Sequence, residues 1–174
     1  MVDKISDIES QYIGKYVNHS NIPQLNKERK DDVGQPVRAV LKGYPIELYG
    51  PNENDTVFIE DSDIDDIFIP AYGRASITAA FNIAIPEDHV GLLWSRSGMS
   101  KKHGIECGAG CLDPSYRGLV GVILYNHSHI PYNIKHGDNI CQLLTIPIYA
   151  LPYVQVESLE ETDRGDAGFG SSGR

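Results

Sequence analysis

The chain has 174 residues, which is enough for one domain with its own hydrophobic core and little more. Hydrophobic residues make up 41% and charged residues 22%, as in an ordinary soluble globular protein. The formal net charge of −9 argues against a nucleic-acid partner, because binding a phosphate backbone requires a basic surface. A small polyphosphate stays compatible with this charge if Arg or Lys residues and a divalent cation meet it locally.

Cysteine usage and hydropathy indicate the compartment. Cys107, Cys111 and Cys141 are too few and odd in number for a disulfide framework, so they favour a reducing environment. Residues 1–10 carry charges where a signal peptide needs an apolar run. The longest apolar stretch, residues 140–154, is too short to span a bilayer. We therefore expect a cytoplasmic protein without a membrane partner, in the host cytoplasm if the source is viral.

Residues 1–36 are predicted to form an N-terminal extension. Its apolar residues between Ile5 and Tyr16 fall near helical spacing, which predicts one short amphipathic helix. The polar residues 19–32 that follow have no strong period. Nothing in the extension indicates a function.

From residue 37 to residue 156 the pattern changes to short β-favouring runs, which Gly, Pro, Asn and Asp separate at intervals of about 8–12 residues. No long helical period interrupts them, so a parallel βαβ sheet is disfavoured. This segment is predicted to be an all-β sandwich or barrel. The expected strands cover residues 37–42, 46–50, 56–60, 66–70, 75–81, 89–94, 119–126 and 139–149.

Residues 157–174 form a glycine-rich C-terminal segment. Ordering its glycines without contacts costs too much entropy, so it cannot fold alone. A frayed tail is the ordinary interpretation of such an end. However, an Arg, a Phe and two Ser among the glycines are the components of a lid over a nucleotide. We therefore predict a flexible arm that orders by docking.

Within the barrel, three short motifs stand in a fixed order. Arg96, Ser97 and Gly98 combine a charged fork, a hydroxyl and a close backbone amide, which suit a phosphate oxygen. Residues 110–118 read Gly-Cys-Leu-Asp-Pro-Ser-Tyr-Arg-Gly, and residues 137–143 read Gly-Asp-Asn-Ile-Cys-Gln-Leu. Alone, each motif is better explained as a surface turn or a buried strand, and the strength of the signal lies in their order.

Together with the arm at residues 164–173, these motifs resemble those of the trimeric dUTPase family, within the dUTPase/dCTP deaminase superfamily. The resemblance covers roughly residues 67–174 and implies a distorted jelly-roll or β-barrel subunit. It implies a homotrimer with active sites shared between subunits, in which each arm closes over a neighbouring site. The implied reaction is hydrolysis of dUTP to dUMP and pyrophosphate, which limits uracil incorporation into DNA and supplies dUMP for thymidylate synthesis.

The resemblance also assigns roles to residues. Asp113 is implied to be the general base that activates water, and Tyr116 to pack beneath the deoxyribose where a ribose hydroxyl would clash. The hairpin backbone at Gly110, Cys111 and Leu112 is implied to pair with uracil. The remaining substrate-binding residues implied by the family are Arg96, Ser97, Gly98, Gln142, Arg164, Phe169, Gly170, Ser171 and Ser172.

The resemblance implies Mg²⁺ bound through the triphosphate and water, without a direct protein ligand. Glu47 is the nearest counterpart of the family's carboxylate that orders the metal-bound water, and Glu60 and Asp61 are rival placements. Asn139 stands where the family has Arg, so that role is not transferred. His103, Cys107 and Cys111 have the spacing of zinc ligands on a helix, but the intervening glycines disfavour a helix, and we expect buried thiols instead.

Two alternatives stay open. A dCTP deaminase, or a bifunctional dCTP deaminase/dUTPase, has a similar turn, but it carries a catalytic Glu where this chain has Ile123. A dUTPase-fold regulatory protein would act by protein–protein contact, and residues 1–36 or the acidic residues 51–66 would offer its surface. Pyrophosphate release from dUTP separates this second alternative from an enzyme.

Overall fold

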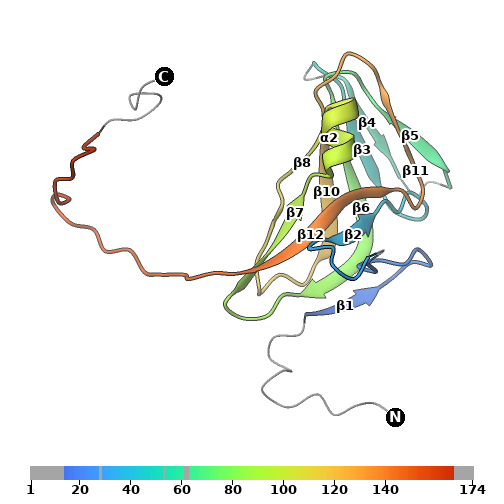
Figure 1. Cartoon of the computed structure of the whole chain (residues 1–174). Helices are drawn as coiled ribbons and strands as arrows, with labels where there is room; N and C mark the ends of the chain where they lie inside the picture. Colours follow the sequence, from blue (N-terminus) through green and yellow to red (C-terminus); the bar gives the residue numbers. More distant parts are fainter. Residues whose placement is uncertain (1–13, 28, 53, 61–62, 167–174) are drawn as a thin grey trace, which may run out of the picture.

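The computed structural model describes residues 14–27, 29–52, 54–60 and 63–166 (Figure 1). In chain order the elements are β1 (Lys15–Asn18), β2 (Gln35–Arg38), β3 (Ile46–Tyr49), β4 (Thr56–Ile59), β5 (Asp66–Ile69), β6 (Arg74–Ala84), β7 (His89–Trp94), α2 (Ser97–His103), β8 (Ile105–Gly108), β9 (Cys111–Leu112), β10 (Leu119–Asn126), β11 (Tyr132–Lys135) and β12 (Asn139–Pro147). The predominance of strands confirms the all-β prediction. Each of the eight expected runs overlaps one of these strands, whereas β1, β8, β9, β11 and α2 were missed.

The strands form three antiparallel sheets around one core. The largest sheet has the order β4-β3-β6-β10-β8, with β1 also paired to β6. A second sheet has the order β2-β12-β7-β9, and β11 pairs with β5. Side chains of β10 alternate between core and solvent, so Val120, Val122 and Leu124 are buried while Leu119 and Gly121 face outward. Buried side chains from all three sheets form this one core.

The segment expected to be an extension takes part in this fold from residue 14 onward. Strand β1 pairs with β6, and the expected boundary at residue 36 falls inside β2, which pairs with β12. Tyr16 therefore lies on a strand and not on the predicted helix, and residues 1–13 lie outside the described residues. The helical spacing was misleading because the edge of β6 offers backbone partners that this segment satisfies as a strand.

Gln24 anchors this segment to the barrel. It is 1% exposed, and its amide nitrogen donates to the carbonyls of Arg38 and Ala79, both at 3.0 Å. Its side-chain oxygen accepts the Arg38 N–H at 2.8 Å. One buried side chain thus satisfies three backbone groups on two different strands.

Replacing Gln24 with Leu is expected to lower the free energy of unfolding by about 3 kcal/mol, because the substitution leaves these buried backbone groups without a partner at nearly constant side-chain volume. Urea denaturation at a fixed protein concentration measures the change. Gln155→Leu, at an exposed glutamine of the C-terminal segment, is the matched control. Equal midpoints for the two variants would contradict the anchoring role.

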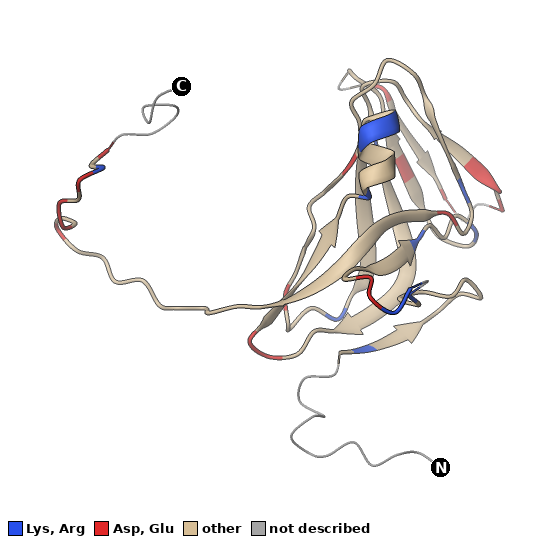
Figure 2. Ribbon diagram, in the orientation of Figure 1, with Lys and Arg blue, Asp and Glu red and all other residues tan. Residues whose placement is uncertain are grey.

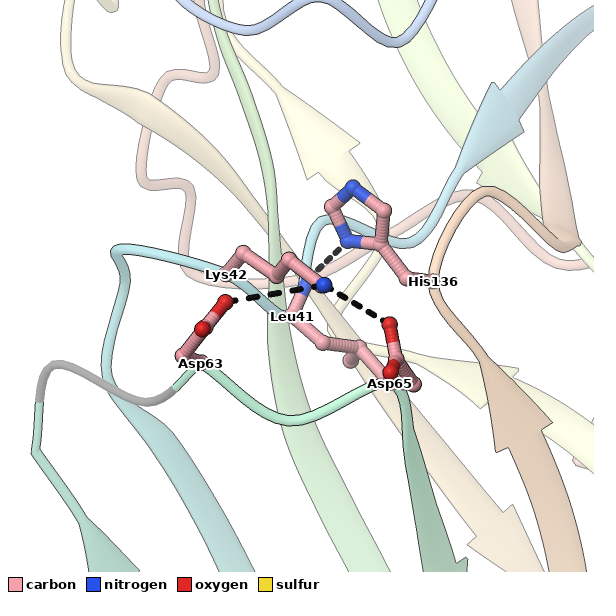
Figure 3. Close-up of polar contacts among 5 residues, drawn as sticks. All are labelled: Leu41, Lys42, Asp63, Asp65 and His136. Carbon is pink, nitrogen blue, oxygen red and sulfur yellow. Dashed lines mark hydrogen bonds and ion pairs between the residues drawn. The ribbon is translucent and has the colours of Figure 1, made fainter.

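The acidic loop before β5 is held by contacts with Lys42 and His136 (Figure 3). Lys42 lies 2.7 Å from Asp65 and 3.5 Å from Asp63, and the lysine holds the pKa of the Asp65 carboxyl below its ordinary value. His136 accepts the Leu41 N–H at Nδ1, at 3.0 Å, and donates its own backbone N–H to the Asp65 carbonyl. These carboxylates are well exposed, so the ion pairs contribute little stability and serve mainly to hold the loop before β5.

After β12 the chain leaves the barrel. Figure 1 shows residues 148–166 running away from the sheets without forming a strand. Large apolar side chains are exposed along it, including Tyr149, Leu151, Tyr153, Val154 and Leu159. The described residues include no helix with the length and apolarity needed to cross a membrane.

Candidate active site

A hairpin between β8 and β10 carries the motif at residues 110–118. Its strand β9 pairs with β7, and Leu93 donates its N–H to the Gly110 carbonyl at 2.7 Å. A Cβ on Gly110 would come within 2.5 Å of the Leu93 carbonyl oxygen, so only glycine allows this approach. Leu112 points into the core while Cys111 and Asp113 face outward. The alternation fixes which side chains of the hairpin meet solvent.

A tight turn follows, and its hydrogen bonds make it rigid. The Tyr116 N–H donates to the Asp113 carbonyl at 3.0 Å, and the Tyr116 hydroxyl donates to the Leu119 carbonyl at 2.8 Å. Arg117 donates to the Pro114 carbonyl, and Asn82 of β6 donates to the Arg117 carbonyl. Asp113 and Tyr116 are thereby held at fixed positions on one turn.

A cavity of about 340 Å³ opens beside this turn. Asp113 and Tyr116 lie in its wall together with Cys111 and Leu112 of β9. The remaining lining residues, on the sheet and on the loop before β9, are Ser76, Ala109, Leu119, Gly121 and Ile123. One carboxylate, one aromatic ring and exposed backbone of a strand thus surround a space of the size of a small ligand.

Sequence reasoning missed the sheet residues of this cavity as a group. The outward positions of β10 supply Leu119, Gly121 and Ile123, and the opposite residue of β6, Ser76, pairs with Ile123. The period-2 pattern of residues 119–126 contained this signal, because it distinguishes outward from inward positions. The pattern does not identify the ligand that these outward positions would contact.

Arg96 precedes a short helix that was not predicted. Arg96 is the N-cap of α2 in an extended conformation, and Ser97 and Gly98 form the exposed first turn. Space around Gly98 is open, since a Cβ there would meet nothing within 4 Å. The helix ends at Gly104, whose φ of 67° suits glycine and whose N–H bonds back to the Met99 and Ser100 carbonyls. Basic residues fill its last turn, drawn in blue in Figure 2.

Arg96 and Gln142 line a second cavity, of about 400 Å³. Gln142 lies opposite Trp94 in the β12–β7 pairing and opposite Pro36 in the β12–β2 pairing. Asp32, Val33 and Gly34 complete one wall, so the N-terminal segment contributes to this site. The cavity beside Asp113 and the cavity beside Arg96 have no lining residue in common.

The described part of the arm, residues 157–166, lines neither cavity. Arg164 lies in the exposed segment that runs away from the barrel (Figure 1). The predicted contributions of Phe169, Gly170, Ser171 and Ser172 fall outside the described residues. Among the described residues, the Asp113 group, the Arg96 group and Arg164 thus lie in three separate places.

Glu47 lies on the sheet next to the Asp113 cavity. It pairs with Ser76 across β3 and β6, and Ser76 lines that cavity. The Tyr49 hydroxyl donates to the Glu47 carboxylate, and this bond raises the pKa of Tyr49. The Arg74 guanidinium covers the Tyr49 ring, 4.2 Å from its centroid. Glu47 thus belongs to a cluster beside the cavity and does not line the cavity itself.

The three cysteines lie in different environments. Cys141 is buried and Cys107 half-buried, whereas Cys111 is exposed at the hairpin, which corrects the expectation of buried thiols throughout. Cys111 faces outward because it is the exposed position of a two-residue strand. The His103 ring lies against Tyr132, with ring centroids 5.0 Å apart and the planes tilted by 47°. Among the described residues no three His, Cys, Asp or Glu side chains gather as a metal site.

A comparison with known protein families identifies the region that carries these motifs. The family model described as dUTPase matches residues 62–173. The chain belongs to the dUTPase family. Among curated relatives, the deoxyuridine 5'-triphosphate nucleotidohydrolase of Arabidopsis thaliana is 47% identical over 108 residues, which are 62% of this chain and 65% of that protein. Its counterpart in Candida glabrata is 43% identical over 110 residues, 63% of this chain and 76% of that protein.

The matched region is shorter than two thirds of several of these relatives. It covers 65% of the Arabidopsis protein and 63% of the one from Oryza sativa. In this chain the match begins after residue 61, so β1 to β4 lie outside the family model. The hairpin, the Arg96 motif and the arm of this dUTPase family member all lie inside it.

Solved structures agree on the fold. A mutant dUTPase of Staphylococcus bacteriophage 80alpha with dUpNHpp has a TM-score of 0.72 at 23% identity, covering 93% of this chain and 99% of that chain. A mutant dUTPase of phage phi11 of S. aureus has a TM-score of 0.64 at 21% identity, covering 86% of this chain and 99% of that chain. These likenesses confirm the jelly-roll-like, all-β prediction and extend it over the first strands.

Proposed function

We propose that this dUTPase family member hydrolyses dUTP to dUMP and pyrophosphate. The observation that carries the proposal is the shared cavity of Asp113, Tyr116 and the β9 backbone. The family relatives named deoxyuridine 5'-triphosphate nucleotidohydrolase support it, since the cavity residues lie inside the matched region. The direct test is release of pyrophosphate from dUTP, with dCTP, dTTP and UTP as competing substrates.

In this mechanism Asp113 is the general base. Its carboxylate is exposed at the cavity wall, where it can orient and deprotonate a water molecule. The water attacks the α-phosphorus, the bond to the bridging oxygen breaks, and pyrophosphate leaves. Asp113 takes one proton from the water and the attacking oxygen becomes part of dUMP. No covalent intermediate with the protein is required.

Recognition of the base and sugar rests on the hairpin. The backbone of residues 110–112 offers N–H and carbonyl groups that pair with the edge of uracil, as the family resemblance implies. Tyr116, fixed by its bond to Leu119, packs beneath the sugar. Arg96, Ser97, Gly98 and Gln142 bind the phosphates, and the arm adds Arg164, Phe169, Gly170, Ser171 and Ser172.

Mg²⁺ fits this site as an ion carried by the substrate. The Asp113 cavity contains a single carboxylate, and the described residues hold no cluster of metal ligands, so triphosphate oxygens and water would supply the coordination. Glu47 pairs with Ser76 across β3 and β6 and is the carboxylate that would order this water. When bound, the ion would offset the negative charge of the phosphates. The phi11 dUTPase, by comparison, was described with a structural Mg(II) ion.

Shared active sites in a homotrimer explain why the binding groups are divided. The Asp113 and Arg96 cavities share no residue, and Arg164 lies on an arm that leaves its own barrel. Exposed apolar side chains from Tyr149 to Leu159 require burial, which a neighbouring subunit would provide. In a closed ring each subunit would supply one group to a complete site. Cytoplasmic residence stays a prediction.

Deamination of dCTP is disfavoured by the cavity itself. Ile123, at the position where deaminases carry a catalytic Glu, is one of its lining residues. An aliphatic side chain can neither accept nor donate a proton. The described residues give the regulatory alternative no comparable support: β1 pairs with β6, β2 pairs with β12, and Lys42 forms ion pairs with Asp63 and Asp65.

Replacing Tyr116 with Ala is expected to relax the exclusion of UTP, raising kcat/KM for UTP relative to dUTP by about tenfold or more. The ring fills the place of a ribose 2′-hydroxyl, so its removal opens that space. Steady-state kinetics with both nucleotides measure the ratio. Tyr116→Phe is the control, because it keeps the ring and loses only the bond to Leu119. An unchanged ratio in the alanine variant would contradict the assignment.

A further inference from the structure

Ser95 joins the end of β7 to the N-cap of α2. Its neighbours in the chain, Trp94 and Arg96, both line the cavity that also contains Gln142. Ser95 itself is half-buried and does not line that cavity. It is therefore placed to act on the phosphate site through its neighbours and not by touching the substrate.

Two other strands bind Ser95 at separate atoms. The Cys107 N–H of β8 donates to the Ser95 hydroxyl oxygen at 2.8 Å. The Gln142 side-chain amide of β12 donates to the Ser95 carbonyl oxygen at 3.1 Å. The residue before Arg96 is thus fixed by two strands in addition to its own.

Arg96 is also fixed on its other side. The backbone N–H of Ser100 in α2 bonds to the Arg96 carbonyl at 3.0 Å. Glu106 lies beside Cys107 on β8, and hydrogen bonding from the Ser100 and Ser95 side chains lowers the pKa of its carboxyl. Arg96 is thus preceded by a residue that two strands hold and followed by the first turn of a helix.

We propose that Ser95 is a positioning residue that holds Arg96 and Gln142 in the geometry needed to bind the phosphates. The inference rests on the proposed function, in which Arg96 and Gln142 meet the triphosphate. Arg96 has a long side chain whose affinity for a phosphate depends on where its backbone is fixed. Gln142 donates one of its two side-chain amide hydrogens to Ser95, which leaves the other to donate to a phosphate oxygen.

The test uses the full chain and two ligands. Ser95→Ala is expected to weaken binding of inorganic pyrophosphate by about tenfold and to raise KM for dUTP to a similar degree, with kcat changing far less. Ser95→Thr keeps the hydroxyl and should restore most of the affinity. Ser128→Ala is the matched control, since it also removes a hydroxyl that accepts a backbone N–H, from Ile130 at 3.3 Å, outside both cavities.

The inference is overturned if Ser95→Ala binds pyrophosphate with wild-type affinity, or if Ser128→Ala loses as much affinity as Ser95→Ala. It is also overturned if the unchanged chain does not bind pyrophosphate. If Ser95→Ala does not fold, Ser95→Cys decides, because its thiol is a weaker acceptor for the Cys107 N–H and should weaken pyrophosphate binding in the same way. The proposed function is judged separately, by release of pyrophosphate from dUTP by the unchanged chain. If the unchanged chain hydrolyses dUTP and Ser95→Ala binds pyrophosphate as well as wild type, the proposed function stands and the positioning role is rejected.

Discussion

Asp113→Asn is expected to reduce kcat for dUTP hydrolysis by a factor of about 10²–10⁴ while the affinity for the nucleotide stays close to wild type. The amide has nearly the shape of the carboxylate but cannot accept the proton of the attacking water. Because the Asp113 side chain is exposed and the turn is held by its backbone carbonyl, the substitution should leave the hairpin folded. Single-turnover kinetics measure the chemical step, and calorimetry with dUTP measures affinity.

Asp88→Asn is the matched control for this experiment. It makes the same chemical change at an exposed acid outside the Asp113 and Arg96 cavities, and its positive φ of 59° suits asparagine as well as aspartate. It should therefore hydrolyse dUTP at the wild-type rate. Hydrolysis by Asp113→Asn near that rate would remove Asp113 as the base and with it the mechanism on the hairpin.

Truncation after Asp163 is expected to abolish hydrolysis, and activity should return when the truncated chain is refolded with the Asp113→Asn chain. The truncated chain keeps the base and lacks Arg164 and the arm, whereas the other chain has the arm and lacks the base. If arms act on neighbouring subunits, random assortment makes about a quarter of the sites complete. Pyrophosphate release by the mixture, relative to wild type, measures this fraction.

The direction in which the arm leaves its own barrel is the structural reason for this experiment. Residues 148–166 run away from the barrel that carries them and expose apolar side chains along their length (Figure 1). Each variant refolded alone is the control and should stay inactive. Background activity in the mixture, with mixed assemblies verified by native mass spectrometry, would reject shared sites and leave the dUTPase family assignment untouched.

The hairpin and the Arg96 motif illustrate what could be read from local sequence. The Asp-Pro-Ser-Tyr run forms the turn that carries Asp113 and Tyr116. The residue preferences of such a turn concern adjacent positions, so the turn can be predicted without knowing the fold. The period-2 runs predicted the central strands for the same reason, because alternation of burial is a property of a single strand.

The short elements were missed because their stability comes from elsewhere in the chain. Strand β1 exists through its pairing with β6, more than sixty residues away, and β9 is a two-residue strand held against β7. Helix α2 has seven residues and no side-chain N-cap, so local propensity alone would not sustain it. Burial of Met99 in the core holds it in place.

Local sequence thus determined the class of fold, the order of the motifs and the chemistry that each motif offers, because hydrophobic period, turn residues and side-chain type are carried by adjacent residues. Only the tertiary structure decided which groups meet. It joined Ser76 and Ile123 to Asp113 in one cavity, placed Arg96 and Gln142 in another, and bound Ser95 from two further strands. These meetings depend on long-range register and burial, which are set by the packing of the whole chain and not by any one segment.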